Sequence, residues 1–239
     1  MHFEEELKIL EKISENSIYA TKIATAATQY SGEVLLRYMK DGNVLELGPA
    51  EGIMTDILYP KFKDYTIVDG SQLFVNDLKK RYPDMKTYNS LFEQFSPKEK
   101  FSNIILGHVL EHVENPVEIL KLCKTWLKED RGEGYILAAV PNANSIHRQA
   151  AVEMGLMKKV NEFSEKDVRH GHRRVFFRDE FLECFNQAGL EIIKEGGYWL
   201  KPVSDKQIEE SWTDEMINAF MKLGEVYPDI AAEIYVIAK

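Results

Sequence analysis

Three residues that can bind a ligand or move a proton fall within five positions of one another. They are His108, Glu111 and His112 in the segment GHVLEHVENP, and His172 follows 60 residues after His112. Imidazole titrates near neutral pH, so His112 and His172, with Glu111, are the candidate catalytic residues of an acid–base reaction. Histidine and carboxylate together also suit a divalent ion, which makes His108, Glu111, His112 and His172 an alternative metal set. The prediction is a site without a metal, and the metal set stays as the alternative.

A basic run stands out in this otherwise acidic chain. It reads Arg169-His170-Gly171-His172-Arg173-Arg174. Arginine forks match carboxylate and phosphate groups, so Arg173 and His170 are candidate contacts to an acidic group on a substrate. A solvated surface loop is the alternative interpretation.

A turn of small residues follows a short apolar run in the segment ELGPAEG, residues 46–52. Such a turn lets the backbone approach a bound nucleoside closely, and the helix after it offers free N–H groups. Gly48, Ala50 and Gly52 do not have the G-x-G-x-x-G spacing that seats a pyrophosphate, which disfavours a nicotinamide-linked oxidoreductase. A purely structural tight turn is the other interpretation of this segment.

An acidic residue ends the next apolar run, YTIVD, at Asp69, 23 residues after Glu46. A carboxylate at the end of a parallel strand can accept two hydrogen bonds from a ribose diol. Asp69 also precedes a predicted helix, so a helix-capping role is an alternative, and the two roles are compatible.

Short apolar runs alternate with amphipathic stretches from Asn43 onward, which is typical of βα units and a mostly parallel sheet. The predicted strands are 43–47, 65–69, 103–107 and 134–140, a weaker one at 86–88, and two late ones within 190–197 and 231–239. The predicted helices are 52–59, 71–80, 115–127, 178–188 and 205–223, preceded by two or three helices over 3–39 that break near Asn16 and near Ser31-Gly32. Because ligands bind beyond the carboxyl ends of such strands, His108 and the residues after it are expected at the site.

The composition of the 239-residue chain, 44% apolar and 29% charged, is that of one ordinary globular α/β domain. A net charge of −9 argues against a DNA or RNA partner, because phosphate neutralisation needs a basic face. Cys123 and Cys184 lack metal or redox spacing and are interpreted as structural thiols. No secretory signal and no apolar run of about 20 residues is found, so we expect a cytoplasmic protein without membrane contact. The oligomeric state stays open.

Four segments in a fixed order carry a family resemblance: ELGPAEG, VDG, VLEHVENP and LKEDRGEGYILAAVPN. Over about residues 43–201 the chain resembles the class I S-adenosylmethionine-dependent methyltransferases, especially the branch of the ubiquinone O-methyltransferases. The resemblance implies an α/β fold with a Rossmann-like, seven-stranded, mostly parallel sheet whose last strand is antiparallel, flanked by helices. It also implies an N-terminal helical lid, residues 1–40, on an S-adenosylmethionine-binding domain, residues 41–239.

The resemblance also implies roles for particular residues. The cofactor-binding residues would be Glu46, Gly48 and Gly52 at the amino-acid end, Asp69 and Gly70 at the ribose, Ser90, Leu91 and Phe92 at the adenine, and His108 at the methionine portion. In the lid, Tyr19 would face the acceptor, and the 171–176 run, similar to a G-H-x-R-x-F segment, would lie near the acceptor pocket. Ala50 departs from the family's middle glycine, which adds a methyl beside the cofactor, and this methyl is expected to be tolerated if φ stays negative.

The function implied is methyl transfer to an O or N atom of a small molecule or peptide end, with an acidic group on the acceptor as one option. Some similar methyltransferases hold a divalent ion with E-x-x-E-H and a distant His. Here His108 replaces the first Glu, which would favour zinc, nickel or iron(II) over magnesium. A regulatory protein that binds S-adenosylmethionine without turnover is the remaining alternative.

Overall fold

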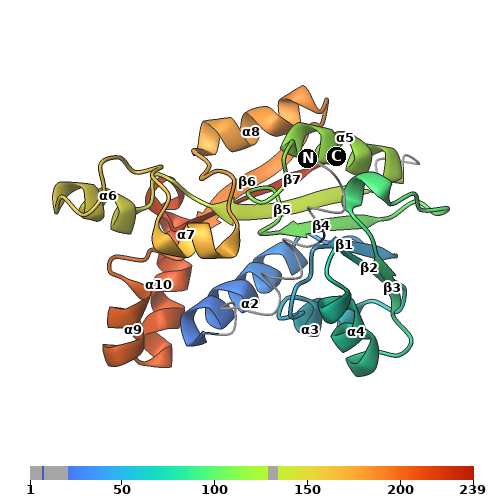
Figure 1. Ribbon diagram of the computed structural model, residues 1–239, viewed down its shortest axis with the longest axis horizontal. Helices are drawn as coiled ribbons and strands as arrows, with labels where there is room; N and C mark the ends of the chain where they lie inside the picture. The colour runs from blue at the N-terminus through green and yellow to red at the C-terminus, as the bar shows by residue number, and fades with distance from the viewer. Residues whose placement is uncertain (1–6, 8–20, 129–133) are drawn as a thin grey trace.

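A seven-stranded sheet runs through the centre of the protein (Figure 1). The computed structural model describes residues 7, 21–128 and 134–239. The strands are β1 (Val44–Leu47), β2 (Tyr65–Asp69), β3 (Lys86–Asn89), β4 (Asn103–Gly107), β5 (Tyr135–Pro141), β6 (Ile192–Tyr198) and β7 (Glu233–Ala238), in the order β3-β2-β1-β4-β5-β7-β6. The first five strands pair in parallel, and β7 is antiparallel to both β5 and β6. The predicted fold class is confirmed.

Helices cover both faces of the sheet. They are α2 (Lys22–Leu36), α3 (Thr55–Leu58), α4 (Gln72–Arg81), α5 (Pro116–Trp126), α6 (Ile146–Glu153), α7 (Glu165–His170), α8 (Arg178–Gln187), α9 (Asp205–Ser211) and α10 (Asp214–Val226). Helices α5 and α8 lie on one face, and α2, α3, α4 and α10 lie on the other (Figure 1).

The apolar runs of the central strands bury side chains on both faces, as the sequence predicted. In β4, Ile104 and Leu106 join the core beneath α5 and α8, and Ile105 joins the core beneath α2 and α4. All three are fully buried. The central strands are therefore fixed by two separate layers of packing, which gives their carboxyl ends a rigid position.

Helix α2 runs without interruption through Ser31 and Gly32, so the predicted break there is wrong. A Cβ at Gly32 would lie 3.3 Å from Met54 Cγ, which shows that the glycine serves close packing rather than a turn. Val34 and Leu35 of this helix are fully buried in the same core as Ile105. The other helices expected before residue 21 lie outside the described residues.

Two predicted helices differ in extent from the observed ones. The first begins at Thr55 rather than at residue 52, because Gly52 has a left-handed φ of 76°, and it continues as a 3-10 turn over Tyr59–Lys61. The predicted helix 205–223 is two helices, because Trp212 is extended and the Thr213 side chain caps α10. Helices α6 and α7, between β5 and α8, were not predicted.

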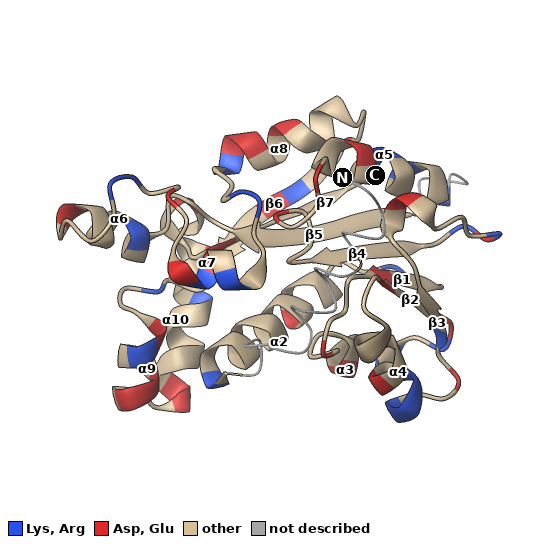
Figure 2. Cartoon of the chain, viewed as in Figure 1, with Lys and Arg blue, Asp and Glu red and all other residues tan. Residues whose placement is uncertain are grey.

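Charged residues gather on the helices and loops, and strands β4 and β5 carry none (Figure 2). Helices α4, α8 and α9 each carry both acidic and basic residues (Figure 2). Among the helices described here, none is both long enough and apolar enough to cross a lipid bilayer.

Replacement of Gly224 tests the packing of α10 against the sheet. A Cβ at this position would lie 2.2 Å from the backbone nitrogen of Trp199, so Gly224→Ala must displace the helix. Helix propensity alone predicts a gain from this change, but overpacking of about 1–3 kcal/mol is expected to outweigh it. We expect a lower free energy of unfolding in urea than for Asn218→Ala, an exposed control on the same helix. An unchanged or higher value for Gly224→Ala would contradict this packing.

Candidate functional site

A cavity of about 720 Å³ lies at the carboxyl ends of β1, β2 and β4. Its lining includes Gly48 after β1, Asp69 at the end of β2 and His108 after β4. It continues past the end of β5 to helices α6 and α7. One cavity therefore spans both the predicted cofactor residues and the predicted acceptor residues.

The small-residue turn after β1 uses left-handed backbone at three positions. Gly48, Ala50 and Gly52 have φ angles of 62°, 47° and 76°. The negative φ that was the condition for tolerating Ala50 is not observed, and this residue bears the strain that glycine avoids. A Cβ at Gly48 would lie 3.0 Å from Val109 and 3.5 Å from Phe92. Glycine at this position therefore keeps space in the cavity that a larger residue would fill.

Asp69 presents a carboxylate that backbone N–H groups hold in place. Its Oδ1 accepts a hydrogen bond from Ser71 N at 2.8 Å, and its Oδ2 accepts one from Ala50 N at 3.3 Å. The side chain lines the cavity while supporting the start of α4, whose N-cap residue is Ser71. The ribose role and the role at the helix start are compatible in this geometry.

Glu46 is buried beneath the turn. Its Oε2 accepts hydrogen bonds from Thr55 Oγ1 at 2.7 Å and from the Tyr65 hydroxyl at 2.8 Å. Burial raises the pKa of Glu46 to about 7, although both hydrogen bonds favour the ionised form. Glu46 therefore lines the cavity as a carboxyl group that gains or loses a proton near neutral pH.

The loop after β3 is fastened beside the end of β2. The Asn89 side chain donates to the carbonyls of Asp69 and Gly70 at 3.1 and 2.9 Å, and Ser90 N donates to Asp69 O at 3.0 Å. The predicted adenine residues Ser90, Leu91 and Phe92 consequently line the same cavity as Asp69.

His108 follows β4 with a left-handed φ of 59°. Its ring Nε2 lies 3.3 Å from the Tyr198 hydroxyl, and its Nδ1 lies 3.7 Å from a carboxylate oxygen of Glu111 and 3.7 Å from one of Glu233. Burial opposes protonation, but Glu111 and Glu233 outweigh it and raise the pKa of His108. The backbone of His108 thus borders the cofactor side of the cavity, while its ring faces two acids.

The three candidate catalytic residues do meet in space. One ligand atom from each of Glu111, His112 and His172 lies within 4.8 Å of the others. The two imidazole rings stand edge to face with centroids 4.7 Å apart. Of the four residues in the alternative metal set, His108 lies outside this group, because its ring turns toward Tyr198 and Glu233.

Arg174 explains why residues 60 positions apart become neighbours. Its guanidinium donates to the carbonyls of Leu110, Val113 and Glu114 at 2.9, 2.6 and 2.8 Å. Arg173 N also donates to Glu111 O at 2.9 Å. These bonds fasten the 171–174 segment to the loop after β4.

The basic run therefore divides into three roles. Arg174 is structural, and Arg169 lies on the surface within 3.7 Å of Glu165. His170 and Arg173 line the cavity, and their role as acceptor contacts stays a prediction. The surface-loop interpretation holds for Arg169 only.

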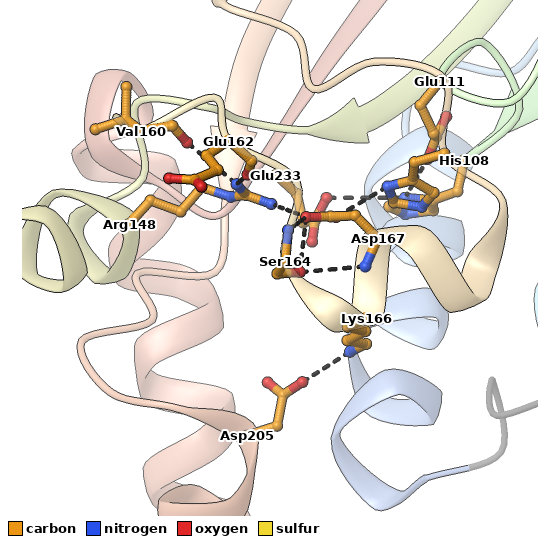
Figure 3. A network of polar contacts seen from close by, with 11 residues as sticks. His108, Glu111, Arg148, Val160, Glu162, Ser164, Lys166, Asp167, Asp205 and Glu233 are labelled. Atoms are coloured by element: carbon orange, nitrogen blue, oxygen red, sulfur yellow. Dashed lines mark hydrogen bonds and ion pairs between the residues drawn. The ribbon is translucent and has the colours of Figure 1, made fainter. Parts of the chain in front are cut away.

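Asp167 and Arg148 belong to the site and were missed by the sequence reasoning. Asp167 Oδ1 lies 3.0 Å from His172 Nδ1. The Oδ2 atom of Asp167 accepts hydrogen bonds from Arg148 at 2.6 Å and from Ser164 Oγ at 2.7 Å (Figure 3). Burial opposes ionisation, but these three partners hold the pKa of Asp167 far below its usual range. The S-x-x-D pattern at Ser164 signals a helix start, yet nothing in the sequence places that helix beside His172.

Two histidines of the cavity, His112 and His170, are neutral at pH 7. Burial lowers the pKa of His112 to about 4, and the same cause lowers the pKa of His170 to about 4. Neutral imidazole is the form that accepts a proton or binds a metal ion. The imidazoles of His112 and His170 are therefore uncharged before any ligand binds.

Helix α2 closes one side of the cavity with Ile23, Ala24, Ala27 and Thr28. Tyr19, the predicted acceptor contact, lies outside the described residues. Tyr30, the other tyrosine of this segment, is buried and donates its hydroxyl to Glu225 on α10.

Residues 19–195 match the family model described as a methyltransferase domain. The chain belongs to this methyltransferase family. A curated relative, the ubiquinone biosynthesis O-methyltransferase of Dinoroseobacter shibae, is 29% identical over 108 residues. That alignment covers 45% of this chain and 41% of the relative, so the chain matches less than half of that enzyme's length.

Two solved structures share the fold of this methyltransferase. One is an S-adenosylmethionine-dependent methyltransferase of Thermotoga maritima, described as a possible histamine N-methyltransferase, with a TM-score of 0.67, 16% identity, and coverage of 96% of this chain and 99% of that one. The other is the N-methyltransferase NodS of Bradyrhizobium japonicum bound to S-adenosylhomocysteine, with a TM-score of 0.58, 13% identity, and coverage of 100% and 98%. At these identities the two structures establish a shared fold with methyltransferases that are described as S-adenosylmethionine-dependent or are bound to S-adenosylhomocysteine.

The residues present fit that cofactor. The glycine turn keeps open a space that a Cβ at Gly48 would narrow, and Asp69 aims an oriented carboxylate into it. An apolar wall from Leu91 and Phe92 completes a surface suited to a nucleoside.

Replacement of Asp69 tests the cofactor half of the cavity. Asp69→Ala removes charge-assisted hydrogen bonds to the ribose, so we expect S-adenosylhomocysteine to bind about 10- to 100-fold more weakly in calorimetry. Asp84→Ala, an exposed carboxylate near the end of α4, is the matched control and should bind normally. Equal affinity of Asp69→Ala and the parent would show that Asp69 does not hold the ribose.

Proposed function

We propose that this methyltransferase transfers a methyl group to an O or N atom of a small molecule or a peptide end, with His172 as the general base. The observation that carries the proposal is a series of contacts, in which buried Arg148 pairs with Asp167 and Asp167 lies beside His172. His172 in turn lies close to Glu111 and His112. It lies in the same cavity as the glycine turn and Asp69.

The cofactor half of the cavity positions the methyl donor. In this proposal Glu46, Gly48 and Gly52 hold the amino-acid end, Asp69 and Gly70 hold the ribose, Ser90, Leu91 and Phe92 pack on the adenine, and the His108 backbone borders the methionine portion. S-adenosylmethionine supplies an activated methyl group on a sulfonium, and alignment with the acceptor then accounts for much of the rate. Its positive charge would also favour the ionised form of Glu46.

The acceptor half removes the proton that methylation displaces. The Asp167 carboxylate favours a proton on Nδ1 of His172, which leaves the lone pair of Nε2 for the acceptor. Arg148 and Ser164 hold Asp167 in place, so Asp167 acts as a positioning residue. His112 and Glu111 would orient the acceptor beside this base.

The comparisons are compatible with methyl transfer to oxygen and with methyl transfer to nitrogen. The matched relative is named for O-methylation, whereas the two structural neighbours are described as N-methyltransferases. His170 and Arg173 remain candidate contacts for an acidic group, and α2 is the proposed lid over the cofactor. The groups placed for proton transfer favour turnover over a purely regulatory role. The cytoplasmic location and Tyr19 as an acceptor contact stay predictions.

Metal-assisted methylation of a hydroxyl is a second candidate. Within the residues that the structure describes, neither carboxylate oxygen of Glu111 has a hydrogen-bond partner. The carboxylate of Asp167 behind His172 matches the arrangement that orients a metal-ligating imidazole. One carboxylate and two imidazoles fit zinc, nickel or iron(II) better than magnesium, so Glu111, His112 and His172 would hold such an ion against the acceptor oxygen.

Variants of the proposed base test the first candidate. Turnover is followed with labelled S-adenosylmethionine and a pool of cell metabolites. We expect His172→Ala to lower kcat about 10²- to 10⁴-fold with unchanged affinity for S-adenosylhomocysteine. Asp167→Asn should lower kcat and Asp167→Glu should restore part of it, whereas Asp179→Asn, an exposed control on α8, should have no effect. Unchanged turnover in both His112→Ala and His172→Ala would eliminate a histidine base.

Metal removal separates the two candidates. A general base needs no ion, so activity should survive exhaustive dialysis against a chelator, and elemental analysis should find no stoichiometric metal. Loss of activity that zinc, nickel or iron(II) restores would instead establish the metal-assisted reaction.

A further inference from the structure

Three basic side chains on the acceptor side of the cavity, Arg148, Lys166 and Lys201, are engaged with carboxylates. Arg148 lies 2.6 Å from Asp167. Lys166 and Lys201 lie 2.7 and 2.8 Å from the two oxygens of Asp205. Asp167 and Asp205 therefore have cationic partners within the chain (Figure 3).

Two other carboxylates of the cavity lack such partners. Both oxygens of Glu111, and Oε2 of Glu233, have no hydrogen-bond partner within the described part of the chain. Each residue instead has one oxygen 3.7 Å from the same atom, His108 Nδ1, beyond hydrogen-bond distance. Because both distances share that atom, the two oxygens lie no farther apart than twice this length. One imidazole cannot neutralise two carboxylates, even when it is protonated.

Burial makes this imbalance costly. Glu111 is 1% exposed, and the Glu233 side chain is 15% exposed. An ionised carboxylate at such depth destabilises the fold unless a cation or several donors face it. Glu111 lines the cavity, so a bound ligand can supply the missing charge.

The two carboxylates flank the place where the methyl group is delivered. Glu111 follows the carboxyl end of β4, and Glu233 begins β7 opposite Pro141, at the carboxyl end of β5. Gly107 and His108, at the end of β4, line the same cavity and border the proposed cofactor site. A group held by both carboxylates would therefore lie beside the methyl donor.

We propose that the methyl acceptor is a basic amine held between Glu111 and Glu233, an inference that rests on the proposed methyl transfer. An ammonium offers three donors and no acceptor, which complements two carboxylates. The bound ammonium gives one proton to His172, and the freed nitrogen lone pair forms the new N–C bond. The methyl–sulfur bond breaks with its electron pair left on sulfur, so the positive charge passes from sulfur to the methylated nitrogen.

The position of Glu233 distinguishes a bound ammonium group from a bound metal ion. The group that could ligate a metal contains Glu111, His112 and His172 but not Glu233. An ion in that group would compensate Glu111 but would have no ligand from Glu233. An ammonium between the two carboxylates faces both of them.

The test compares amines with alcohols of the same shape. Benzylamine with benzyl alcohol, and phenethylamine with phenethyl alcohol, are titrated into the protein saturated with S-adenosylhomocysteine, and methylation is followed with labelled S-adenosylmethionine. We expect each amine to bind at least about tenfold more tightly than its alcohol and to be methylated on nitrogen. Glu111→Gln and Glu233→Gln should each lose at least about tenfold in amine affinity while binding S-adenosylhomocysteine normally. Glu118→Gln, at an exposed glutamate on α5 that does not line the cavity, is the control and should match the parent.

Equal binding of amines and alcohols, or unchanged amine affinity in both Gln variants, would overturn the inference. Zinc or manganese binding that Glu111→Gln abolishes, with amine affinity unchanged, would assign Glu111 to a metal and overturn it as well. If the protein methylates only hydroxyl acceptors, methyl transfer stands and the amine inference fails. If it does not bind S-adenosylhomocysteine, the proposed function itself fails.

Discussion

Strand β1 lies between β2 and β4, and both neighbours run parallel to it. Parallel pairing brings the carboxyl ends of all three strands to one edge of the sheet, and the order of the strands reverses at β1. The positions of the segments that line the proposed cofactor site follow from this arrangement of strands. The glycine turn leaves β1, Asp69 ends β2, and the segment with His108 and Glu111 leaves β4. Two layers of buried apolar side chains keep these ends from shifting relative to one another.

The acceptor side depends on how buried charge is compensated. Asp167 is stabilised by Arg148, Ser164 and the nearby His172, so it can hold an imidazole in one orientation. Within the part of the chain that the structure describes, both oxygens of Glu111 and Oε2 of Glu233 lack a hydrogen-bond partner, and the fold keeps these side chains buried at a cost to stability. In the proposed amine complex, the substrate supplies the partner that these two carboxylates lack.

Two segments that leave the sheet at different strands complete this side of the cavity. Helices α6 and α7 follow β5 and contribute Arg148 and Asp167. The chain then passes the loop after β4, and there Arg174 donates hydrogen bonds to three backbone carbonyls of that loop. Loss of those bonds would free the 171–174 segment and separate His172 from His112. The cofactor half rests on the sheet itself, whereas the acceptor half rests on side-chain contacts between loops. The acceptor half is therefore the part that can vary while the fold stays the same.

The sequence by itself determined the strands, their mostly parallel order and the cofactor turn, because buried strands and small-residue turns leave local patterns that survive any tertiary context. It also predicted that Glu111, His112 and His172 would act together, although spacing alone could not bring His172 across 60 residues. Helix α2 continues through Ser31 and Gly32 because core packing overrides the local break signal, and Ala50 takes a left-handed φ that its residue type disfavours. Only the tertiary structure decided that Asp167 and Arg148 stand behind His172, that Arg174 is structural, and that Glu233 faces His108 from the far end of the chain. Those relationships depend on long-range contacts between charged side chains, which have no periodicity for a sequence to reveal.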